Sequence, residues 1–131
     1  MERRNAAAGT ILRVMAVYTG LIGGLFAAYH PGAAALFRTP VRDPRALFGF
    51  GVALLTIAAL KAVMARDPVR HRTMVGIILA SETVFAVWQL YEWIGHGWTA
   101  VAVTGLVDAA FVLLLAVYFP RRDLRIAGTT G

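Results

Sequence analysis

Two acidic residues lie inside long apolar stretches of the sequence, Glu82 in one stretch and Asp108 in the next. A carboxyl group costs a few kcal/mol to insert into a membrane, so an acid in such a place is expected to serve a function or to have a partner. At about 100° per residue, Gln89 shares a helical face with Glu82, and Thr104 shares one with Asp108. We expect these four residues to form a site that handles a proton or binds a ligand.

The predicted depth of the two carboxyl groups brings them close together. At 1.5 Å per residue, Glu82 lies about 12 Å from one membrane surface and Asp108 about 14 Å from the other, which are similar heights in neighbouring antiparallel helices. If their faces meet, the two groups would share one proton or bind a cation. One structural alternative is that both are protonated and form hydrogen bonds across helices. Another is that Lys61, otherwise expected to extend to the membrane interface, turns inward and neutralises Glu82.

A second polar group is predicted near the outer membrane surface. Glu92 and His96 are four residues apart on one helical face and Trp93 lies beside them. His30 and Asp43 of the first connection could join them. Carboxylate and imidazole groups bind zinc and related ions. No further pair with a fixed ligand spacing accompanies them, so whether a metal binds is left open, with ordinary interfacial polar residues as the alternative. We expect no bound cofactor.

Four long apolar segments must position these residues, and each is predicted to be a membrane-spanning helix. The mean hydropathy of +0.67, with 59% hydrophobic and 15% charged residues, is too apolar for a soluble domain. A helix of about 20 residues crosses a hydrocarbon core of roughly 30 Å. The predicted helices are residues 10–29, 46–64, 74–94 and 99–119, and residues 30–45 form an outer interfacial loop. The sequence therefore predicts an all-α antiparallel bundle in a single membrane domain, residues 1–131.

Basic residues flank these segments unequally, and this bias predicts their orientation. One side holds Arg3, Arg4, Arg66, Arg70, Arg72, Arg121, Arg122 and Arg125, whereas the other holds Arg38, Arg42 and Arg45. Cytoplasmic flanks carry the excess of Lys and Arg, so both termini are expected in the cytoplasm. The clusters form no contiguous basic face, and no nucleic-acid partner is expected.

Small residues recur at every fourth position of the first segment, at Ala16, Gly20, Gly24 and Ala28. Small residues on one face let helices approach closely in a membrane. The row is predicted to pack against another helix of the chain, with a second copy or another membrane subunit as the alternative partner. The chain has no cysteine, which excludes disulfide and thiol chemistry.

Short motifs stand at the predicted helix ends. They are Tyr29-His30-Pro31-Gly32, Arg42-Asp43-Pro44, the run from Arg66-Asp67-Pro68 to Arg70-His71-Arg72, and Phe119-Pro120-Arg121-Arg122. Their order resembles that of the DoxX-like superfamily of small four-helix bacterial membrane proteins. The resemblance implies a four-helix bundle in the inner membrane, often linked to redox or respiratory partners. It implies no catalytic residue.

The sequence favours a small non-enzymatic membrane protein that acts as an accessory or stabilising subunit of a larger inner-membrane complex, such as a redox or respiratory one. It contains no strong catalytic motif, and most of its residues lie in the predicted helices. One alternative is a proton-coupled transporter or channel-like oligomer that uses Glu82 and Asp108. Another is a lipid- or isoprenoid-modifying enzyme that uses Glu82, Glu92 and His96. The expected partners are the lipid bilayer and other membrane subunits or further copies of the chain.

Overall fold

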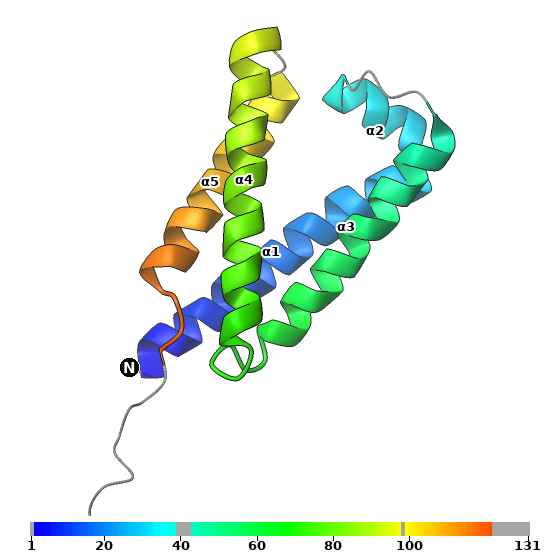
Figure 1. The fold of residues 1–131 in the computed structure, drawn as a ribbon. Coiled ribbons are helices and arrows are strands. Elements are labelled where there is room, and N and C mark those ends of the chain that lie inside the picture. The colour runs from blue at the N-terminus through cyan, green and yellow to red at the C-terminus, as the bar shows by residue number, and fades with distance from the viewer. Residues whose placement is uncertain (1, 39–42, 98, 122–131) are drawn as a thin grey trace, which may run out of the picture.

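The computed structural model describes residues 2–38, 43–97 and 99–121 of the chain. The described residues form five helices and no strand (Figure 1). They are α1 (Glu2–Ala28), α2 (His30–Phe37), α3 (Pro44–Met64), α4 (Arg72–His96) and α5 (Thr99–Val117). All except the short α2 are long and apolar enough to cross a membrane. The chain is therefore a multi-pass membrane protein, and the predicted all-α bundle is confirmed.

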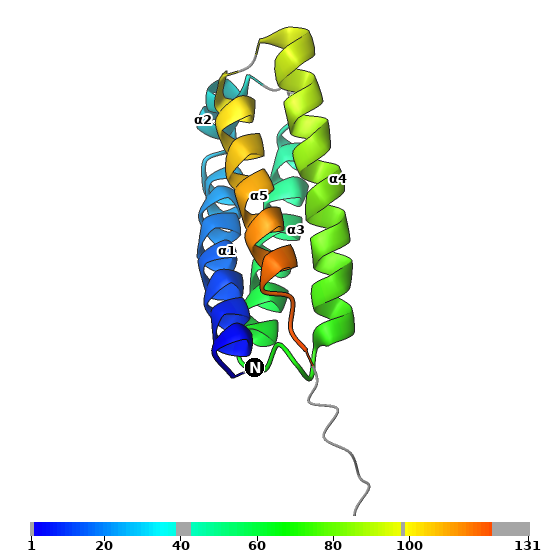
Figure 2. The same ribbon diagram turned by 90° about the vertical axis from the view of Figure 1, so that its left-hand side faces the viewer.

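The four long helices pair into two antiparallel hairpins. Helix α1 packs along α3, and α4 packs along α5, while contacts between the two hairpins are far fewer. The hairpins lie close together where α1 begins and diverge toward the end where α2 lies (Figure 1). Seen from the side, the long helices run roughly parallel to one another (Figure 2). The two hairpins thus form a bundle that is closed at one end and wider at the other.

An apolar core joins both hairpins at the closed end. It consists of Leu12, Met15, Met64, Ala65, Val75 and Leu115. Beside it, the Arg4 side chain donates a hydrogen bond of 3.2 Å to the backbone carbonyl of Phe119. The Asn5 side chain donates one of 3.3 Å to the carbonyl of Arg121. The first and last described residues therefore lie at the same end of the bundle.

The predicted outer loop contains the short helix α2. Pro31 stands in its first turn, where a missing N–H group costs no helical hydrogen bond. Arg38 ends the helix in the left-handed region at φ 49°, and its N–H donates to the carbonyls of the last turn. Ala33 is fully buried against α1 and α3. The connection thus folds back onto the open end of the bundle.

The long helices differ from the predicted ones at their ends: three are longer and one ends earlier. Helix α1 begins at Glu2 instead of residue 10, and α4 extends beyond 74–94 at both ends. Apolarity marks the part of a helix that crosses lipid, whereas polar turns outside it keep the same backbone hydrogen bonds. Helix α5 ends at Val117, two residues earlier than predicted, because Pro120 disfavours helical backbone in the residue before it.

Close contact between α1 and α3 depends on a glycine pair that faces across the two helices. A Cβ added to Gly51 would stand 2.4 Å from the backbone nitrogen of Ala27, and one added to Gly23 would stand 2.9 Å from the carbonyl oxygen of Gly51. Gly20 faces the Ala58 side chain at an ordinary 3.6 Å. Only residues without a side chain allow the two backbones to approach this closely at the pair.

The structure places two residues of the predicted small-residue row at the packed face of α1 and two away from it. Ala16 is buried and Gly20 faces α3, but Gly24 has nothing within 4 Å of a Cβ position, and Ala28 is exposed. Four residues turn a helix by about 400°, so a row spaced by four drifts about 40° at each step. By its third member, Gly24, the row has rotated away from α3, and Gly23 takes the facing position.

Candidate functional site

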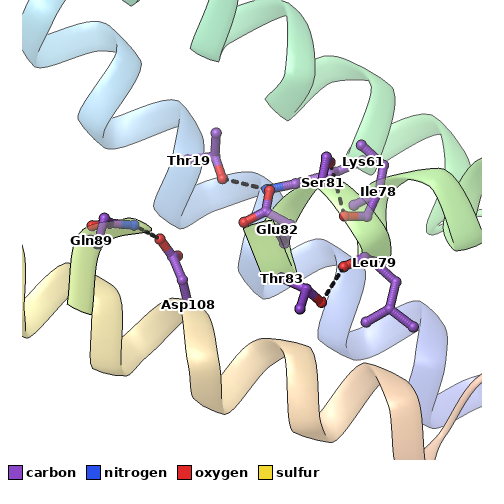
Figure 3. A network of polar contacts seen from close by, with 9 residues as sticks. All are labelled: Thr19, Lys61, Ile78, Leu79, Ser81, Glu82, Thr83, Gln89 and Asp108. Carbon is purple, nitrogen blue, oxygen red and sulfur yellow. Dashed lines mark hydrogen bonds and ion pairs between the residues drawn. The ribbon is translucent and has the colours of Figure 1, made fainter. Parts of the chain in front are cut away.

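A buried ion pair connects the two hairpins (Figure 3). The Nζ atom of Lys61 on α3 lies 2.6 Å from Oε1 of Glu82 on α4. The same ammonium group donates a hydrogen bond of 2.8 Å to the hydroxyl of Thr19 on α1. Lys61 is only 1% exposed. Opposite charges at this distance compensate each other in a low-dielectric interior, so Lys61 ties three helices together.

A second group of polar side chains joins α4 to α5. Nε2 of Gln89 donates a hydrogen bond of 2.6 Å to Oδ2 of Asp108, as Figure 3 shows. The hydroxyl of Thr104 in turn donates to Oε1 of Gln89. Gln89 and Asp108 are 3% and 5% exposed. We call the six residues of the two groups the polar layer: Thr19, Lys61, Glu82, Gln89, Thr104 and Asp108.

The two carboxyl groups occupy the same region of the interior, but each has its own partner. Among the described residues no hydrogen bond joins Glu82 to Asp108; Glu82 pairs with Lys61, and Asp108 with Gln89. The expectation that Lys61 extends to the membrane interface is wrong, and the inward alternative is confirmed. Lys61 lies one turn before the end of α3 beside the buried Met64, so its side chain reaches Glu82 in place of the interface.

A largely apolar cavity of about 570 Å³ adjoins the polar layer between the hairpins, and all five helices contribute to it. Its volume is within the usual range for small-molecule sites. Five aromatic side chains form much of its wall, namely Phe26, Phe37, Phe50, Phe85 and Trp88. Its polar lining comes from Tyr18, Thr19, Ser81, Glu82, Gln89, Thr104 and Asp108. The arrangement can hold an apolar molecule beside buried polar groups.

Tyr18 on α1 is a functional candidate that helical arithmetic on the acids did not reveal. Its ring packs 5.7 Å from that of Phe111 on α5, centroid to centroid. Tyr18 lines the cavity, and its hydroxyl is buried and has no hydrogen-bond partner among the described residues. The available signal was a Tyr-Thr pair at positions 18 and 19 within the apolar stretch that follows Arg13. Tyr18 therefore adds a buried polar group beside the cavity that no described residue uses as a hydrogen-bond partner.

The predicted outer polar group forms only in part. Nδ1 of His96 lies 2.9 Å from Oε2 of Glu92, as their spacing indicates. His30 instead begins α2, and Trp93 is 42% exposed. The described residues contain no group of three or more His, Cys, Asp or Glu side chains that could hold a metal ion. His30 therefore does not complete a metal-binding group with Glu92 and His96 in the described part of the chain.

Four membrane-spanning helices around an apolar cavity with a polar layer define a small multi-pass membrane protein. Within this class, residues 8–125 match the model of the BphX-like family, and the chain belongs to that family. A comparison with curated proteins and one with solved structures each found no match. The DoxX-like resemblance stays a prediction.

Proposed function

We propose that the protein binds a lipophilic small molecule within the membrane, in the cavity between its two hairpins. The observation that carries this proposal is an aromatic-lined cavity that adjoins buried polar side chains. Protein interiors are normally close-packed, and an apolar pocket with a few convergent polar groups is typical of a ligand site. The hydrocarbon part of the molecule would lie among the aromatic rings.

The polar layer would receive the polar end of such a molecule. The unpartnered hydroxyl of Tyr18 can donate one hydrogen bond, and the carboxyl group of Asp108 has a second oxygen beside the one that Gln89 contacts. Phe50, Phe85 and Trp88 line the cavity and are also exposed on the surface of the bundle. A molecule dissolved in the bilayer would therefore enter between α3 and α4.

This role is that of a binding protein, and no residue is assigned to catalysis. It is consistent with the accessory or stabilising subunit of an inner-membrane complex that the sequence favours, which we retain as the wider proposal. The transporter that uses Glu82 and Asp108 and the lipid-modifying enzyme that uses Glu82, Glu92 and His96 remain the alternatives. We also retain as proposals the bacterial inner membrane, the cytoplasmic position of both termini and the DoxX-like relationship.

The proposal is tested by quenching of tryptophan fluorescence with brominated probes, because bromine quenches an indole on contact and Trp88 lines the cavity. The probes are 4-bromobenzyl-trimethylammonium and its neutral isostere 1-bromo-4-neopentylbenzene, added to protein in phosphatidylcholine nanodiscs. Concentrations are expressed per lipid, and the Trp88→Phe variant identifies the signal of Trp88. We expect saturable quenching of Trp88 by one or both probes.

Two neighbouring substitutions on α4 separate the cavity from the lipid surface. Ser81 lines the cavity, whereas Ala80 is exposed outside it. Ser81→Phe should weaken saturable quenching about tenfold or more by filling part of the cavity, and Ala80→Phe should leave it unchanged. Quenching that never saturates and is equal in all variants would contradict the proposed function.

A further inference from the structure

The positive and negative charges of the side chains at the cavity do not cancel. Glu82 and Asp108 are the charged side chains of the described residues that line it, and both are acidic. Lys61 lies behind Glu82 and is held by it at 2.6 Å. Asp108 has the neutral amide of Gln89 as its hydrogen-bond partner. One buried carboxyl group at the cavity is thus left without a counter-ion.

We propose that the cavity binds lipophilic organic cations, and that Asp108 pairs with the cation in exchange for a proton. The inference rests on the proposed function, because it names the class of molecule that the same cavity takes. A carboxylate in a low-dielectric interior needs either a proton or a paired cation. The exchange is balanced: the O–H bond of the protonated carboxyl group breaks, the proton leaves to solvent, and the cation replaces its charge.

The wall of the cavity favours the same class of molecule. The rings of Phe85 and Trp88 are stacked with centroids 5.6 Å apart, and those of Phe26 and Phe50 meet edge to face at 5.1 Å. The faces of such rings attract quaternary ammonium groups, most strongly in sites without water. An apolar neutral molecule would use the wall but would leave Asp108 without a charge partner.

Three other titratable groups face Asp108 from the helices around it. They are Tyr18 of α1, Lys61 of α3 and Glu82 of α4, and each of them interacts electrostatically with Asp108. The side chain that α2 contributes to the cavity, Phe37, carries no charge. Lys61 and Glu82 satisfy each other, and Tyr18 is a neutral phenol. Asp108 is therefore the group that exchanges a proton for the cation.

This exchange has a defined dependence on pH. Acidification returns the proton to Asp108 and removes the charge that holds the cation, so cation affinity falls as the pH is lowered. In the range where the free site is protonated, the affinity changes about tenfold per pH unit, and one proton is released for each cation bound. A neutral molecule in the same cavity shows no such dependence.

The test compares the trimethylammonium probe with its neutral neopentyl isostere, which differ in one charge at nearly equal shape. Binding is followed by quenching in phosphatidylcholine nanodiscs at several pH values between pH 5 and pH 8. Proton release is obtained by calorimetry in buffers of different ionisation enthalpy. We expect the cation to bind about tenfold or more tightly than the isostere at the upper end of this range.

Asp108→Asn should remove both the preference for the cation and the release of a proton, while the isostere still binds. Glu92→Gln, an acidic position outside the cavity, should keep both. If Asp108→Asn fails to fold, the charge preference and pH dependence of the natural chain decide the question. Both probes could bind equally at every pH, with this binding lost in the Ser81→Phe variant. That result overturns the cation inference but not the proposed function. Failure of both probes to saturate overturns both.

Discussion

At the scale of single residues, the polar interior depends on Lys61. Its ammonium group contacts both Glu82 and Thr19, so one side chain links α3 to α4 of the other hairpin and to α1 of the same hairpin. A buried ion pair need not be more stable than an apolar pair of the same size, but removing one member leaves a charge without compensation. The structural importance of Lys61 therefore shows when one partner alone is changed.

Lys61→Met should lower the free energy of unfolding by about 3–5 kcal/mol, because Glu82 would stay buried without its counter-ion. Thermal or chemical unfolding in detergent, followed by circular dichroism, measures the change. The double variant Lys61→Met with Glu82→Gln should recover most of the loss. Arg13→Met alters an exposed basic residue of α1 and serves as the control, with an expected effect within about 0.5 kcal/mol. A double variant as unstable as Lys61→Met would contradict this role.

The members of the polar layer were predictable to different degrees. Helical arithmetic places Glu82 and Gln89 on one face and Thr104 and Asp108 on another, and the structure turns all four inward. The same arithmetic cannot say which residue on a different helix meets each of them. The choice of Lys61 for Glu82, and of Gln89 for Asp108, depends on the rotation and spacing of packed helices, which periodicity within one helix does not contain.

At the scale of elements, the hairpin of α1 and α3 depends on backbone contact at the glycine pair. A methyl group at Gly51 would stand 2.4 Å from the backbone of α1, which no change of side-chain rotamer can relieve. The helices would have to separate along their whole interface. Gly24, one position after Gly23, carries no such restriction.

Gly51→Ala should therefore destabilise the protein by about 1–3 kcal/mol, as overpacking of a close interface does. Gly24→Ala makes the same chemical change on a face with free space, and should be neutral or stabilising by up to about 1 kcal/mol from helix propensity. The unfolding midpoints of the two variants, measured side by side in one detergent, compare them directly. Equal losses in both would show that the glycine pair does not hold the helices together.

At the scale of the whole molecule, hydropathy alone could predict the spanning helices, because twenty apolar residues in succession have few other stable environments. The cavity was not predictable in this way. It exists because the two hairpins touch at one end and diverge at the other, and that tilt is set by the buried contacts of the closed end. The short α2 was likewise missed, since its eight residues lie among prolines that favour a loop assignment.

The orientation predicted from the arginine clusters can be tested without background labelling, because the chain has no cysteine. Ala6→Cys near the start of α1 and Thr73→Cys near the start of α4 lie at the closed end, and Ala35→Cys lies on α2; all three sites are exposed. None of these changes alters a charge. In intact bacterial cells a membrane-impermeant maleimide should label Ala35→Cys alone, and lysis should expose the other two. The reverse pattern would place the termini outside.

The apolar core at the closed end blocks any passage from the cavity through that end of the bundle. If the proposed molecule enters between α3 and α4, it has to leave by the same route, so the described conformation would store or present it without passing it across the bilayer. Passage would require a second conformation in which this core opens while the hairpins meet around α2. The hydrogen bonds of Arg4 and Asn5 to the carbonyls of Phe119 and Arg121 would then break, and the first and last described residues would separate.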